Sequence, residues 1–169
     1  VNASHTFDSQ FVISKEIEVI GITKSNWNAN NLINVFKACF EYKYSDITID
    51  FSGATMDLKE WRQFYRATKD LKSNYITGII WDNNFVTEEF INITKNCKRL
   101  KTLSIKNYQR QDMPLIVELI ANTLTLKELI IPGDYNEKDI KILIKALVNN
   151  ITIKKIDFSG NRVQTKTIH

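Results

Sequence analysis

Few side chains in this sequence have the type and spacing that catalysis requires. The pentapeptide IDFSG occurs twice and places Asp50 and Asp157 in equivalent positions, and a pair of carboxylates is the usual equipment of general acid–base chemistry. The two histidines, His5 and His169, lie near the ends of the sequence, far from either aspartate. Whether the aspartates meet therefore depends on the fold between them.

The cysteines predict neither a metal site nor a disulfide framework. Cys39 and Cys97 lie far apart in segments that favour helices, with no Cys-x-x-Cys pair and no histidine close by in the sequence. The five glycines form no phosphate-binding loop. We therefore expect a protein that is not an enzyme and that uses no cofactor and no metal.

Composition narrows the class of partner. The chain has 169 residues, 43% of them hydrophobic and 25% charged, which suits one globular domain. Its 23 Lys and Arg are interspersed with 19 Asp and Glu, and the densest basic stretch, Lys95 to Lys101, is short. A surface that follows nucleic-acid phosphates needs its basic residues on one face, so we expect no nucleic-acid partner. No apolar run approaches the roughly 20 residues that span a bilayer, so we expect no membrane span.

A repeat connects the two IDFSG copies. The pattern apolar-x-x-apolar-x-apolar recurs along the chain, and its middle positions are residues 20, 49, 79, 103, 129 and 156. The step between copies is therefore 24 to 30 residues. Repeats of this length are typical of architectures in which one structural unit is stacked on the next.

Each copy combines two periodicities. An alternating stretch predicts a short strand, and a following stretch with a helical period predicts a helix. The expected strands lie near 19–23, 48–52, 78–82, 102–106, 128–132 and 155–159, and the expected helices near 29–42, 58–71, 87–96, 113–122 and 137–149. Helix starts are marked by Asp57 with Glu60 as a capping box, by Thr87, and by Pro114 after Asp112.

The alternation predicts an α/β fold with a parallel sheet, because each helix returns the chain to the same end of the sheet. Strands about 4.8 Å apart and helices about 10 Å apart would bend the stack into a right-handed α/β solenoid, with strands on the concave side and helices on the convex side. We expect an N-terminal capping segment at 1–16 and a repeat domain of about six units at 17–169. The sequence after the sixth strand lacks the helix that the repeat predicts, so we expect a fragment or an unusual C-terminal edge. Trp61 and Trp81 fall at apolar positions and should pack in the core, whereas Trp27 lies in a loop and is the tryptophan expected to be exposed.

The stretches NITIKKIDFSGNRV and NTLTLKELIIPGD resemble leucine-rich repeats of the long, ribonuclease-inhibitor-like type. The resemblance covers about residues 17 to 163 and implies a horseshoe segment. The asparagine that the family places after the strand is present as Asn84 and Asn161. Other residues occupy the remaining four positions: Ser25, Ala54, Tyr108 and Asp134.

A solenoid presents its concave strand face to partners, and the alternation of strand residues predicts which side chains lie there. Ile80 and Ile130 are the apolar members and form the expected centre of a binding surface. The candidate partner-binding residues are Thr48, Asp50, Ser52, Ile80, Asp82, Thr102, Ser104, Lys106, Glu128, Ile130, Lys155 and Asp157.

The leading functional expectation is a protein–protein interaction domain with a protein partner. The family includes inhibitors, innate immune sensors and secreted bacterial effectors, so the resemblance implies an adaptor, sensor or effector in the cytoplasm, or in a host cytoplasm for an effector. One alternative is an actin-binding regulator similar to the tropomodulin C-terminal domain, whose helix-to-strand junctions carry N-x-x-L phrases that NTLTLKEL and NNITIKKI resemble. A second is a GTPase-activating repeat protein, for which Arg110 is the candidate arginine.

Overall fold

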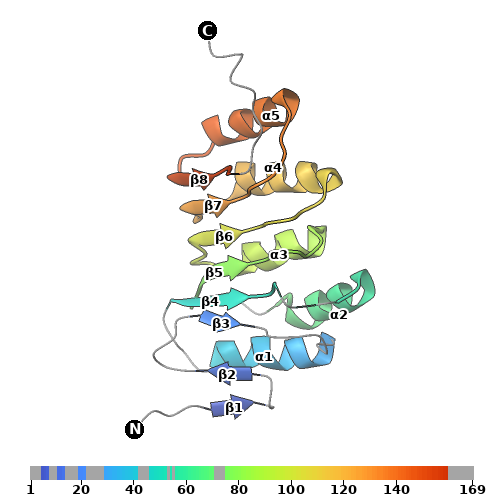
Figure 1. Cartoon of the computed structure of the whole chain (residues 1–169). Coiled ribbons are helices and arrows are strands. Elements are labelled where there is room, and N and C mark those ends of the chain that lie inside the picture. Colours follow the sequence, from blue (N-terminus) through green and yellow to red (C-terminus); the bar gives the residue numbers. More distant parts are fainter. Residues whose placement is uncertain are drawn as a thin grey trace.

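The computed structural model describes residues 5–7, 11–13, 19–21, 29–41, 46–52, 54, 56–70 and 75–159 (Figure 1). The strands are β1 His5–Phe7, β2 Phe11–Ile13, β3 Val19–Gly21, β4 Ile47–Asp50, β5 Ile76–Ile80, β6 Thr102–Ser104, β7 Glu128–Ile130 and β8 Lys155–Asp157. The helices are α1 Ala29–Glu41, α2 Leu58–Thr68, α3 Glu88–Asn96, α4 Met113–Asn122 and α5 Glu137–Val148, with a short 3-10 helix, η1, at Arg110–Asp112.

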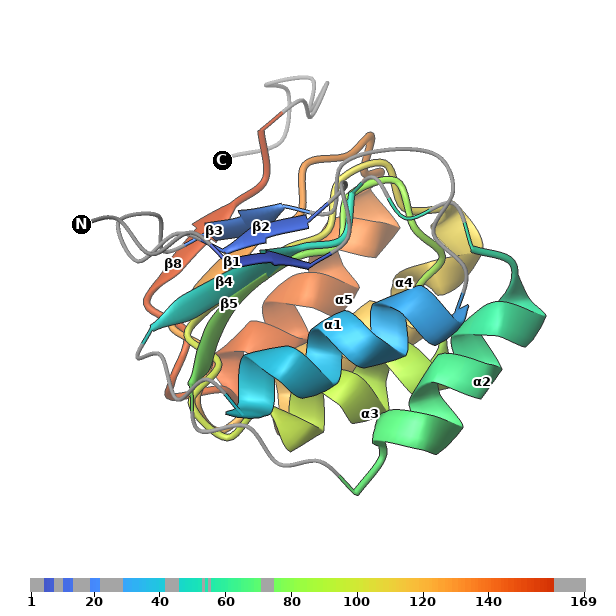
Figure 2. The same cartoon turned by 90° about the horizontal axis from the view of Figure 1, so that it is seen from below.

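The main sheet is parallel, and its strands lie in the order of the sequence, from β3 to β8. Figure 2 shows the helices together on one side of this sheet. From β3 to β8, strands and helices alternate along the chain. These findings confirm the predicted α/β class, the alternation and the parallel sheet.

The strands end earlier than the sequence pattern predicts. The expected strand at 48–52 is observed as Ile47–Asp50, and the expected strand at 78–82 is observed as Ile76–Ile80. The side chain of Asp50 accepts a hydrogen bond from the Ser52 N–H at 2.9 Å and turns the chain there. After β5 the chain turns at Asn83, whose φ of 64° is incompatible with a strand.

Local capping explains where the helices begin. Asp57 and Glu60 form the predicted capping box at the start of α2, and Thr87 caps α3 by accepting from the Phe90 N–H at 3.2 Å. Asp112 precedes α4, with Pro114 in its first turn, as predicted. A further capping box, between Asn136 and Asp139, begins α5.

The core lies between the sheet and the helix layer, and its largest buried side chains are aromatic. Trp81 lies between Trp61 and Phe90, with both ring centroids 4.3 Å from its own, and the Phe51 ring is 5.2 Å away. Each of these four side chains is at most 2% exposed. The predicted core positions of Trp61 and Trp81 are therefore confirmed. Such contacts contribute about 0.5–1.5 kcal/mol per ring pair beyond area burial.

Two strands of the expected capping segment at 1–16, β1 and β2, lie within the described residues. β1 and β2 pair antiparallel, with His5 opposite Ile13, and β2 contacts β3. The rest of that segment lies outside the described residues, as do Ser25, Trp27 and Asn161. Within the described part of the chain, no helix is long and apolar enough to cross a membrane.

Candidate interaction face

The side of the sheet opposite the helices carries the sequence-predicted residues. Ile49, Ile79, Leu103 and Leu129 are each at most 1% exposed and point towards the helix layer. Because successive side chains of a strand alternate between faces, their neighbours point the other way. We call that surface the outward face. Its two rows of paired residues are Thr48, Gly78, Thr102, Glu128 and Lys155, and Asp50, Ile80, Ser104, Ile130 and Asp157.

The second row places two isoleucines between two carboxylates. Ile80 and Ile130 are each partly exposed and lie two strands apart, which corresponds to about 10 Å. Ser104 lies between them but is only 5% exposed, so it adds little accessible surface. Asp50 and Asp157 are partly exposed at the two ends. The row therefore offers a small apolar centre with acidic flanks.

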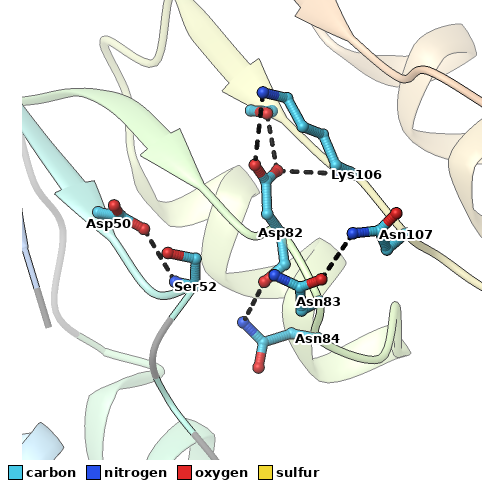
Figure 3. Close-up of polar contacts among 8 residues, drawn as sticks. Asp50, Ser52, Asp82, Asn83, Asn84, Lys106 and Asn107 are labelled. Atoms are coloured by element: carbon cyan, nitrogen blue, oxygen red, sulfur yellow. Dashed lines mark hydrogen bonds and ion pairs between the residues drawn. The ribbon is translucent and has the colours of Figure 1, made fainter. Parts of the chain in front are cut away.

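Asp82 connects β5 to β6 at the edge where these strands end (Figure 3). Its carboxylate accepts from the Ser104 hydroxyl at 2.7 Å and from the Lys106 N–H at 2.9 Å. The Lys106 Nζ lies 3.8 Å from the same carboxylate. The side chain of Asp82 is 13% exposed and that of Lys106 is 50% exposed. Among Asp82, Ser104 and Lys106, the side chain of Lys106 is the most exposed, because Asp82 and Ser104 bind each other.

Three asparagines at the same edge were not among the predicted site residues. Asn84 is 7% exposed and donates to the Phe51 carbonyl at 2.8 Å, which ties one unit to the preceding one. Asn107 donates to the Asn83 side chain at 2.7 Å, and both have a positive φ, of 57° and 64°. Asparagine tolerates that conformation better than most residues, which is the sequence signal that locates these turns. The two side chains lie side by side in Figure 3.

Asp50 and Asp157, the aspartates of the two IDFSG copies, make the same kind of hydrogen bond. Asp157 accepts from the Ser159 N–H at 2.7 Å, as Asp50 does from Ser52 at 2.9 Å. This hydrogen bond holds the pKa of Asp157 below its usual value. Strands β4 and β8 are four steps apart in the sheet, which corresponds to about 19 Å, so the two carboxylates do not form an acid–base pair.

The first row is shaped by a close contact and an ion pair. Thr48 covers Gly78, where a Cβ atom would lie 2.3 Å from the Thr48 hydroxyl oxygen. Glu128 and Lys155 form an ion pair at 2.6 Å, which raises the pKa of the Lys155 ammonium. The partly exposed Thr102 lies between Gly78 and Glu128.

Residues behind the two alternative functions are engaged within the chain. Arg110 forms an ion pair with Asp139 at 3.0 Å, which links η1 to α5. Asn150, in the phrase NNITIKKI, donates to the carbonyl of Ile120 at 2.8 Å and accepts from the N–H of Ile153 at 2.9 Å. The N-x-x-L phrase therefore has a structural role here. The actin-regulator and GTPase-activating alternatives stay predictions, for which actin co-sedimentation and GTP hydrolysis with Arg110→Ala are the assays.

A pocket of about 250 Å³ lies where α3 and α4 lead into β6 and β7. Leu100, Leu103, Leu119 and Cys97 contribute to its wall. Burial raises the pKa of the Cys97 thiol to about 12. A thiol that stays protonated is a poor nucleophile, so the pocket has the character of an apolar cavity rather than of a reactive site.

The outward face combines apolar, hydroxyl, acidic and basic side chains on a regular framework, an arrangement suited to binding a second surface. Within the described residues, no three His, Cys, Asp or Glu side chains are grouped so as to hold a metal ion. No protein-family model and no curated protein matches the chain.

Proposed function

We propose that this chain is a leucine-rich-repeat solenoid of the ribonuclease-inhibitor-like type and that it binds a protein partner through its outward face. Two observations support the repeat assignment. The anchors Ile49, Ile79, Leu103 and Leu129 occupy one buried line across neighbouring strands. Asn84 binds the backbone of the preceding unit, which is the part that the family's asparagine plays.

One observation carries the functional proposal. Ile80 and Ile130 remain partly exposed in the middle of the sheet, whereas the neighbouring Ile79 and Leu129 on its other face are buried. Interface centres combine apolar anchors with a polar rim, and charged residues surround the pair here. The rim comprises Asp50, Lys106, Glu128 and Asp157. The chain then acts as a binding domain rather than an enzyme, in an adaptor, sensor or effector.

The test compares proteins captured by the wild-type chain and by the Ile80→Asp/Ile130→Asp variant. Each new carboxylate would have to lose water at the centre of the interface without a partner, so we expect capture to fall by at least about tenfold. Far-UV circular dichroism and thermal melting of the variant show whether it remains folded. A milder variant, Ile80→Thr/Ile130→Thr, keeps the β-branched side chains that favour strands, so it tests the same face if the aspartate variant misfolds.

The matched control is Leu124→Asp/Ile142→Asp, which makes the same chemical change at two exposed positions away from the outward face. We expect a protein that binds the outward face to be captured by the control variant and not by the Ile80/Ile130 variants. Equal capture by all folded variants would refute the assignment of the binding face. The repeat architecture would be unaffected by that result.

A further inference from the structure

Among the described strands, β8 lies at one end of the main sheet and is paired along one of its two edges. Within the described residues, β7 is the only strand that pairs with it. An open strand edge carries backbone donors and acceptors that can pair with another chain. The direction of these groups along β8 shows how such a pairing is built.

The hydrogen bonds from β8 to β7 come from the residues on either side of Ile156. The Lys155 N–H donates to the Lys127 carbonyl at 3.1 Å, and the Asp157 carbonyl accepts from the Ile131 N–H at 3.0 Å. Successive residues of a strand direct their backbone groups to opposite edges. Ile156 therefore directs both its N–H and its C=O to the edge of β8 that faces away from β7.

We propose that a second copy of this chain pairs with β8 in an antiparallel arrangement, with a two-fold axis at Ile156. In this register the N–H of each Ile156 donates to the carbonyl of the other, which is a hydrogen-bonded antiparallel pair. The contact uses the same surface on both copies, so it closes at a dimer and occupies the β8 edge of each copy.

The side chains complement each other in that register. Lys155 lies opposite Asp157 of the second copy, and Asp157 lies opposite its Lys155, so two pairs of opposite charge form on the outward face. Lys155 already binds Glu128 at 2.6 Å, and an ammonium has three donors, so it can bind both carboxylates. Asp157 already accepts from Ser159, and its carboxylate can accept a further hydrogen bond because each oxygen has two lone pairs.

The last helix supplies apolar surface for the same dimer. A two-fold axis perpendicular to the sheet keeps the helix layers of both copies on one side, so α5 of each copy becomes the neighbour of the other. Ile144, Val148 and Ile151 are 51%, 76% and 84% exposed. Ile144 and Val148 are four residues apart and lie on one side of α5, and Ile151 follows shortly after the end of the helix. Pairing of the two α5 helices would cover these side chains.

The experiment measures dimer dissociation by sedimentation equilibrium over a concentration series. Lys155→Asp alone, or Asp157→Lys alone, turns both attractive pairs into repulsive ones. We expect each to raise the dimer Kd by at least about tenfold, whereas the double variant restores the opposite charges and dimerises again. Lys127→Asp makes the same charge change at an exposed position directly before β7 and should leave the dimer intact. Circular dichroism checks that each variant is folded.

Cross-linking checks the register. Opposite residues of a non-hydrogen-bonded pair have Cα atoms about 4.5 Å apart, within disulfide range. A mixture of Lys155→Cys and Asp157→Cys proteins should therefore form a disulfide-linked dimer that neither forms alone. The proposal is overturned if the wild-type chain is monomeric at about 100 μM, or if the double charge swap fails to restore a dimer that both single swaps weaken.

Discussion

Asn150 gives the sharpest test of how one unit is tied to the next. Its side chain donates to the carbonyls of Ile120 at 2.8 Å and Thr123 at 3.0 Å, about 30 residues earlier in the chain. It accepts from the N–H groups of Thr152 at 2.8 Å and Ile153 at 2.9 Å. One amide thus connects the end of α4 to the turn that leads into β8.

Asn150→Ala removes these four hydrogen bonds at once. Each intramolecular hydrogen bond contributes about 1 kcal/mol net, and the freed groups regain part of this from water because the site is only partly buried. We expect the free energy of unfolding to fall by about 2–3 kcal/mol. For a chain of this size that corresponds to a Tm lower by about 5–10 °C.

Urea unfolding followed by far-UV circular dichroism measures the change. The transition midpoint should fall without a change in its slope, because the folded surface is otherwise retained. Amide hydrogen exchange gives a local readout, since the N–H groups of Thr152 and Ile153 should lose protection first.

The neighbouring Asn149 is the control. It is exposed and bonds only within its own helix, to the Lys145 carbonyl at 3.2 Å, so Asn149→Ala should change stability by less than about 0.5 kcal/mol. If Asn149→Ala and Asn150→Ala were equally mild, the reasoning that this amide joins consecutive units would be refuted.

Two further predictions concern buried contacts. In Gly78→Ala the new Cβ would lie 2.3 Å from the Thr48 hydroxyl oxygen, so the free energy of unfolding measured in urea should fall by about 1–3 kcal/mol. Adding Thr48→Ala removes that oxygen and should recover part of the loss. Wild-type stability in Gly78→Ala would contradict this prediction. In a Cys39→Ser background, Cys97 should react with a disulfide reagent at pH 8 at least about 100-fold more slowly in the folded chain than in urea, because burial raises its thiol pKa from 9.0 to about 12. The same shift favours the folded state below pH 9.0 and weakens as the pH rises towards 12, and equal reaction rates in the two states would show that the thiol is accessible.

The helices were the most predictable part of the fold. The starts of α2, α3 and α4 depend on Asp57, Thr87 and Pro114, whose contacts lie within one turn of the chain. The strand ends were less predictable, because periodicity alone extended the strand at 48–52 past Asp50. The hydrogen bond from the Ser52 N–H to Asp50 ends it earlier.

The candidate face was predicted in outline only. Alternation placed Ile80 and Ile130 opposite the core, and the register brings them into one row. Nothing in the alternation distinguishes Ser104, which is buried against Asp82, from Lys106, which is exposed. That difference depends on a contact between two neighbouring strands.

The sequence by itself determined the alternation of strands and helices, the buried line of Ile49, Ile79, Leu103 and Leu129, and the repeat length, because each follows from periodicity or from contacts within a few residues. Only the tertiary structure decided that the two IDFSG aspartates lie four strands apart, and that Ile156 directs its backbone away from β7. The physical reason is the same in both cases. The register of neighbouring strands, set by packing between residues about 27 apart, selects which polar groups meet inside the chain and which remain for a partner.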